Sequence, residues 1–194
     1  MLKFSFHKSR FLVSPLAAVL LFAAPPSHSA PTASQGFLPL IDMTATRLHI
    51  ARQVALAKWD TRKPVEDLPR EAKVIEAAAD EARALGVPPV LATNFFSDQI
   101  EANKLVQYGL LAQWHREGRA PDERRVDLAK DIRPQLDSLQ QKFIRALADT
   151  TALRAQPDCN AQLVLATQDY VSSHALDALY ALAMDRALAR VCAP

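Results

Sequence analysis

Residues 40–60, LIDMTATRLHIARQVALAKWD, form the stretch on which the fold prediction rests. Its apolar residues return every three or four positions, which is the spacing of one face of an α-helix. The same spacing continues along the rest of the chain, in which only four glycines occur, 7% of residues are aromatic and strand-like alternation of β-branched residues is missing. The sequence therefore predicts an all-α protein.

Segments that contain proline or glycine separate the expected helices. TRKPVEDLP (residues 61–69) ends the first helix, Gly86 suits the end of the second, and GRAPDERR (residues 118–125) is expected to be a loop. Asp158 is expected to cap the C-terminal helices, which should break near Ser172. The pattern predicts a single-domain bundle of about six helices. The expected helical ranges are about 37–60, 69–86, 90–117, 127–151 and 158–191.

The N-terminal segment has the composition of an export signal. Lys3, Lys8 and Arg10 precede the apolar run of residues 11–24, which is too short to span a bilayer and is followed by small residues. Cleavage after Ser29 fits these small residues best, and a retained N-terminal anchor is the alternative. We therefore expect a periplasmic or secreted protein. Its parts would be a cleaved signal peptide over residues 1–29, a flexible lead-in over 30–36 and a helical domain over 37–194.

The basic charge of the full chain comes from this leader. The chain has 23 basic and 21 acidic residues, and removal of three leader cations leaves 20 basic residues against 21 acidic ones. The remaining 165 residues are therefore nearly neutral, so their charge gives no reason to expect binding to nucleic acid or, after signal cleavage, to a membrane.

Two cysteines occur, Cys159 and Cys192, and in an exported chain such a pair is predicted to form a disulfide. A metal or redox site would need a CxxC motif or nearby histidine ligands, and the sequence around these cysteines has neither. The disulfide would tie the beginning of the C-terminal helical segment to its end.

Two cations lie on the apolar face of the first expected helix. Met43, Ile50 and Val54 define that face, and helical spacing places Arg47 and Lys58 on it. The two cations are 11 residues apart, which corresponds to roughly 16 Å along a helix axis. Charges directed at a core are costly unless they are paired or hydrogen-bonded.

The third expected helix carries a pair of amides in the same way. Asn103 and Gln107 lie four residues apart in the middle of its inward stripe of Phe, Ile, Leu and Trp residues. Arg70 and Glu71 open the second helix, and Arg133 lies near the start of the fourth. Further carboxylates, including Asp67, precede Arg70.

These inward polar residues have two interpretations. One is an internal network of salt bridges with no ligand. The other, which two cations and an amide pair favour, is a polar pocket for a small ligand with two carboxylates, since arginine binds carboxylate through two hydrogen bonds. The sequence has no nucleophile elbow, phosphate loop, dinucleotide fingerprint or histidine metal motif, so neither a metal nor a cofactor is expected.

The spacing of these residues resembles that of the secreted, periplasmic subclass of the all-helical chorismate mutases (the AroQ class, gamma subclass). The resemblance covers essentially the whole mature chain. It implies an isomerase that converts chorismate to prephenate, a reaction of aromatic amino acid biosynthesis in the shikimate pathway, and a homodimer. The matching segments are LIDMTATRLHIARQVALAKWDTRKPVEDLPRE (40–71), FFSDQIEANKLVQY (95–108) and RPQLDSLQQKF (133–143), followed by the cysteine pair.

The resemblance also implies a role for each site residue. Arg47 and Arg133 would bind the two carboxylates of chorismate, and Lys58 would reach a carboxylate and the ether oxygen. Gln107 would donate to the ether oxygen from the opposite side, as a catalytic residue together with Lys58 and Arg47. Because some relatives carry Glu where Gln107 stands, and Glu must be protonated to donate, we expect activity that does not fall steeply at neutral pH.

The resemblance implies supporting roles for the other four residues. Arg70 would help to form a cationic wall, Glu71 and with it Asp67 would hold the ring hydroxyl, and Asn103 would orient a carboxylate. An intramolecular [3,3] rearrangement needs no nucleophile, metal or cofactor. A periplasmic binding protein for aromatic dicarboxylates without turnover, and a purely structural helical bundle, are the alternatives.

Overall fold

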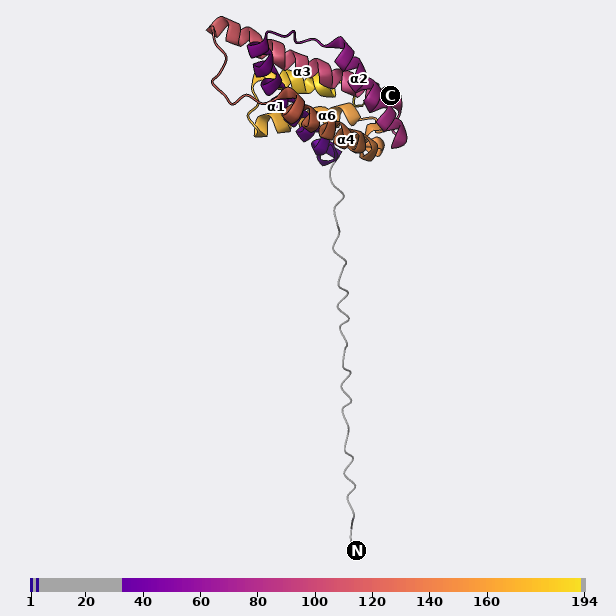
Figure 1. Ribbon diagram of the computed structural model, residues 1–194. Helices are drawn as coiled ribbons and strands as arrows, with labels where there is room; N and C mark the ends of the chain where they lie inside the picture. The colour runs from indigo at the N-terminus through magenta and orange to yellow at the C-terminus, as the bar shows by residue number, and fades with distance from the viewer. Residues whose placement is uncertain (2, 4–32, 193–194) are drawn as a thin grey trace. The chain divides into compact units, whose positions relative to one another are not determined.

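The computed structural model describes residues 1, 3 and 33–192, and residues 33–192 lie in one compact helical unit (Figure 1). Within these described residues there are seven α-helices, one short π-helix and no strand, so the all-α prediction is confirmed. One of the seven, α5, is a single turn of four residues. The helices are α1 (Ala33–Thr61), α2 (Leu68–Ala84), α3 (Pro89–Glu117), the π-helix η1 (Leu128–Ile132), α4 (Arg133–Asp149), α5 (Thr151–Arg154), α6 (Cys159–Ser173) and α7 (Ala178–Leu188).

The start of α1 differs from the sequence prediction. The helix begins at Ala33, so residues 33–36 are helical although they were expected in a loose lead-in. Gly36 lies so close to Leu153 of α5 that a Cβ at this position would approach the Leu153 side chain to 2.3 Å. This contact with a distant segment is a tertiary effect, and it outweighs the weak helix propensity of glycine. The predicted signal peptide, residues 1–29, lies outside the described residues apart from residues 1 and 3.

The fourth expected helix is divided rather than continuous. Asp127 caps its start by accepting from the backbone N–H groups of Ala129 (2.7 Å) and Lys130 (2.9 Å). A π-helical turn follows over 128–132, and α4 begins at Arg133. Because Pro134 has no N–H to donate to the carbonyl four residues earlier, the regular hydrogen-bond ladder is interrupted at this point.

The predicted breaks elsewhere are found, with one difference in capping. Gly86 and Gly118 have the positive φ angles, 72° and 73°, that suit the ends of α2 and α3. The break after Ser173 is confirmed. Asp158 does precede α6, but its side chain makes no hydrogen bond to the helix backbone and instead accepts from the Gln162 side chain at 3.1 Å.

The long helix α3 is central to the bundle. It packs against α1, α2 and α7, while α1 also contacts α4, α6 and α7 (Figure 1). Phe95 and Phe96 of α3 meet Phe143 of α4 in tilted, edge-on arrangements, with ring centroids 5.1 and 6.1 Å apart. None of the described helices is long and apolar enough to cross a membrane.

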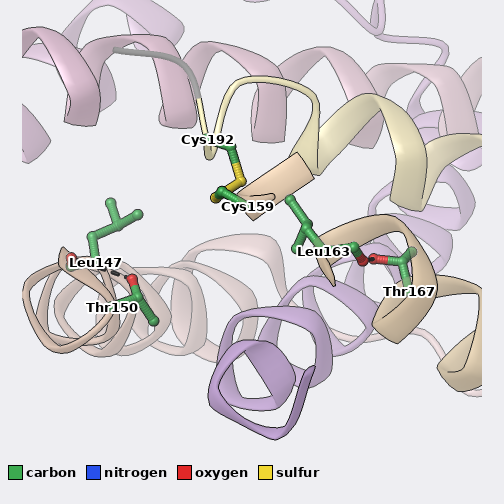
Figure 2. The surroundings of a disulfide bond; sticks show 6 residues. All are labelled: Leu147, Thr150, Cys159, Leu163, Thr167 and Cys192. Atoms are coloured by element: carbon green, nitrogen blue, oxygen red, sulfur yellow. Dashed lines mark hydrogen bonds between the residues drawn. A yellow bond between two sulfur atoms is a disulfide. The ribbon is translucent and has the colours of Figure 1, made fainter. Parts of the chain in front are cut away.

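The predicted disulfide is present. Cys159, the first residue of α6, is bonded to Cys192, which follows α7, and their Cα atoms are 5.8 Å apart (Figure 2). The bond therefore joins the two ends of the α6–α7 segment, as the sequence predicted.

Candidate functional site

A pocket of about 190 Å³ lies among α1, the loop before α2, α2, α3 and the η1–α4 segment. It brings together all eight residues that the sequence selected for the site, although they come from four separate stretches of the chain. Its remaining lining is partly apolar, with Val54, Ile100 and Leu136 among the contributors. The eight predicted residues are Arg47, Lys58, Asp67, Arg70, Glu71, Asn103, Gln107 and Arg133.

Arg47 is a buried cation that has no partner of opposite charge in the part of the chain that the structure describes. The residue is 6% exposed, and its Nε atom has no hydrogen-bond partner. It forms no salt bridge to any of the described residues. Burial lowers the pKa of Arg47 to about 10, so the guanidinium still carries its charge at neutral pH. An uncompensated buried charge is costly, and an anionic ligand in the pocket would supply the missing countercharge.

Lys58 is held in the pocket by the loop between α1 and α2. Its Nζ atom donates a hydrogen bond to the backbone carbonyl of Val65, whose side chain is buried although its neighbours in the loop are exposed. Burial lowers the pKa of Lys58, an effect that the nearby carboxylates of Asp67 and Glu71 oppose. The ammonium group is therefore partly desolvated and fixed in position.

Asn103 and Gln107 form a connected pair on the pocket side of α3. Asn103 Nδ2 donates to the backbone carbonyl of Arg47 (3.0 Å), and Gln107 Nε2 lies 3.2 Å from both the backbone oxygen and the side-chain Oδ1 of Asn103. Both residues are buried. Gln107 Oε1 has no partner among the described residues, which leaves a buried acceptor in the pocket unused.

Asp67 and Glu71 cap the start of α2 reciprocally. Asp67 Oδ1 accepts from the backbone N–H of Arg70 (3.2 Å), and Glu71 Oε1 accepts from the backbone N–H of Asp67 (3.1 Å). The Arg70 side chain extends toward α4, where its Nη2 lies 3.7 Å from Asp137 Oδ1. Arg133, exposed at the start of α4, completes the cationic lining. Asp67 and Glu71 thus organise the helix as well as the pocket.

The sequence interpretation missed one buried charged residue of the pocket, Lys104. Its side chain is 10% exposed and its Nζ atom lies 3.1 Å from Glu71 Oε2 and 2.8 Å from Glu101 Oε1. A signal for it exists, because Ile100, Lys104 and Gln107 follow one another at steps of four and three residues. Asp137 and Gln140 of α4, also missed, line the pocket as well.

Comparisons with known proteins identify the family. Residues 39–108 match the family described as chorismate mutase type II. The chain is 31% identical to the secreted chorismate mutase of Mycobacterium tuberculosis over 93% of this chain and 86% of that protein. It is 28% identical to the secreted chorismate mutase of Mycolicibacterium smegmatis, over 93% and 99% of the two chains. The crystal structure of chorismate mutase from Burkholderia phymatum matches with a TM-score of 0.82 and 45% identity, over 84% of this chain and all of that one.

The chain therefore belongs to the chorismate mutase family, whose members are isomerases. The resemblance inferred from the sequence is confirmed, and so is the interpretation as an enzyme of this kind. Nothing in these comparisons supports the alternative of a binding protein without turnover.

Proposed function

We propose that this protein catalyses the intramolecular [3,3] rearrangement of chorismate to prephenate in the pocket around Arg47. The observation that carries the proposal is the buried Arg47 guanidinium, which has no partner of opposite charge among the described residues and lines the same pocket as a second fixed cation, Lys58, in a chain of this family. Chorismate carries two carboxylates, so it offers the countercharge that the described residues do not provide for Arg47.

The pocket would act first by holding one conformer of the substrate. The reaction forms a C–C bond and breaks a C–O bond within one molecule, so the side chain must lie over the ring before reaction occurs. Arg47 would bind one carboxylate from the buried end of the pocket and Arg133 the other from α4. Asn103, whose amide is anchored to the Arg47 backbone, would orient a carboxylate.

Stabilisation of the ether oxygen is the second contribution. Negative charge develops on this oxygen as the C–O bond breaks, and donors fixed in a partly desolvated pocket stabilise it more than water would. Lys58 would donate from one side and the Gln107 amide from the other, with one Nε2 hydrogen turned from Asn103 toward the ether oxygen. Glu71, supported by Asp67, would accept the ring hydroxyl, and Arg70 would add positive charge to the wall.

The test is turnover. When purified protein is mixed with chorismate, the ultraviolet absorbance of chorismate should fall and prephenate should form. Binding without loss of chorismate would reject the proposal. Arg47→Ala and Lys58→Ala should each lower kcat/KM by about 100-fold or more. Arg145→Ala, at an exposed position on α4 outside the pocket lining, is the matched control and should leave kcat/KM unchanged. Near-normal kcat/KM in both pocket variants would reject the site assignment.

We also propose that the protein is exported and loses residues 1–29. The relatives named as secreted chorismate mutases and the Cys159–Cys192 disulfide support export, since disulfides persist in oxidising compartments. Mass spectrometry of the protein from a periplasmic fraction should give a chain that begins at Ala30. A mass that still includes the leader would favour the retained anchor instead.

A homodimer is the proposed assembly, as the family resemblance implies. Val164 and Leu165 of α6 are 52% and 56% exposed, so this helix carries apolar side chains that a second copy could cover. Light scattering after gel filtration should give twice the mass of one mature chain. A monomer at micromolar concentration would contradict the proposal.

A further inference from the structure

Lys104 lies where α3 contacts the start of α2, and its ammonium group is next to the Glu71 carboxylate. Its ammonium group lies near three carboxylates, those of Glu71 (3.1 Å), Glu101 (2.8 Å) and Glu66 (3.8 Å). The side chains of Lys104 and Glu71 are only 10% and 17% exposed, whereas Glu66 and Glu101 are 57% and 47% exposed. The Lys104–Glu71 pair is thus the one that is shielded from water.

Both oxygens of the Glu71 carboxylate are held. Oε1 accepts from the backbone N–H of Asp67 and Oε2 accepts from Lys104. Each carboxylate oxygen has a second lone pair, so Glu71 can still accept another hydrogen bond from the pocket. Lys104 donates a hydrogen bond to Glu71 and forms ion pairs with Glu101 and Glu66, so these carboxylates compensate its charge. Lys104 therefore has the geometry to fix Glu71 rather than to bind a ligand itself.

We propose that Lys104 is a positioning residue that holds the Glu71 carboxylate in the orientation in which it accepts the ring hydroxyl of the substrate. This inference rests on the proposed function of the pocket. Because both oxygens of the Glu71 carboxylate are already held, this acceptor loses less entropy when the substrate binds. Lys104 would thereby select ligands whose ring carries a hydroxyl donor.

The test is a double-mutant cycle on kcat/KM. Lys104→Met removes the charge but keeps much of the apolar stem, and it should lower kcat/KM by about 10- to 100-fold, the range expected when a hydrogen bond to a charged group is lost. Glu71→Gln should also lower kcat/KM. The double variant should be no worse than Glu71→Gln alone, because Lys104 acts through Glu71. Lys104→Arg, which keeps a cation, should recover part of the activity.

Glu101→Gln is the matched control. It removes the closest ion pair of Lys104 without changing a residue of the pocket lining, so it should leave kcat/KM near that of the wild type. Unfolding midpoints of all variants would be measured alongside, and Lys104→Gln would replace Lys104→Met if the latter did not fold.

Three results would overturn the inference. These are normal kcat/KM in Lys104→Met, losses that multiply in the double variant, and a loss in Glu101→Gln equal to that in Lys104→Met. With an active wild type they would reject the role of Lys104 alone. An inactive wild type would reject the proposed function and this inference together.

Discussion

Asp98 and Arg47 are both buried charges, but only Asp98 has a partner of opposite charge among the described residues. Asp98 is 1% exposed and accepts from both Arg186 and Arg190 of the C-terminal segment. Its charge is compensated within the fold, as in an ordinary structural ion pair. Arg47 has no such compensation. This difference separates a structural charge from one that a ligand is expected to complete.

The lowered pKa of Lys58 predicts a pH dependence. The protonated ammonium is the form that stabilises the ether oxygen, so kcat/KM should fall as pH rises through the Lys58 pKa. Because burial lowers that pKa, the fall should begin at a lower pH than an exposed lysine would give. Rate measurements over the alkaline range, with circular dichroism to verify folding, would check it.

Lys58→Arg is the control for this pH prediction. This variant should have a lower kcat/KM than the wild type. Because its guanidinium keeps its charge to higher pH, its kcat/KM should decline at a higher pH than that of the wild type. A wild-type profile that declines no earlier than that of Lys58→Arg would contradict the assignment of the decline to Lys58.

Gln107→Glu tests the amide opposite Lys58. A glutamine donates at every pH, so wild-type kcat/KM should change little around neutrality. A glutamate at this buried position must be protonated to donate, and it loses that proton as pH rises through its pKa. The kcat/KM of the variant should therefore fall from mildly acidic to neutral pH, while the wild type stays nearly constant. Parallel profiles for the two proteins would exclude a donor role for Gln107.

Helical spacing, helix-start positions and the family resemblance together selected eight pocket residues, but they did not show what each side chain contacts. The spacing placed Arg47, Asn103 and Gln107 on inward faces because helix phase is fixed by sequence position. Lys104 lies on the same face of α3 as Gln107, yet its proposed role depends on carboxylates of α2 and the preceding loop. Such pairings are tertiary and cannot be obtained from one helix considered alone.

At the scale of helices, the start of α2 serves the pocket and the fold at once. The same backbone turn that Asp67 caps also sets the position of Glu71. Propensity and capping rules predicted where α2 and α3 end, since Gly86 and Gly118 are local signals. They did not predict the early start of α1 or the π-helical turn before Arg133. The first depends on a contact with Leu153, and the second on how one proline is accommodated.

Asp67 provides a test of this helix cap. Asp67→Ala removes the side-chain acceptor for the Arg70 backbone N–H, and we expect a loss of about 1 kcal/mol in the free energy of unfolding. Asp67→Asn keeps an acceptor oxygen but removes the charge, so it should retain most of the stability. Urea unfolding of the three proteins would measure both effects. Equal destabilisation by Ala and Asn would show that the charge, rather than the cap, matters.

At the scale of the whole molecule, the pocket and the disulfide lie in different segments of the chain. Every residue of the pocket lining lies in the stretch from α1 through α4, both helices included, whereas the disulfide joins the ends of the α6–α7 segment. The α7 helix packs against α3 and α1, so it supports the helices that carry Arg47, Asn103 and Gln107 without contributing a side chain to the pocket. Stability and chemistry are therefore expected to respond differently to loss of the disulfide.

Cys159→Ala combined with Cys192→Ala tests this separation. The cysteines are 33 positions apart, and closing a loop of that length is worth roughly 3–4 kcal/mol in the chain-entropy treatment, so the free energy of unfolding should fall by about that amount. Urea unfolding would measure the loss, and reductant should destabilise the wild type but not the double variant. At a temperature where the variant remains folded, kcat/KM should stay near the wild-type value because the pocket residues are untouched. A large loss of kcat/KM in the folded variant would show instead that the α6–α7 segment controls the geometry of the pocket.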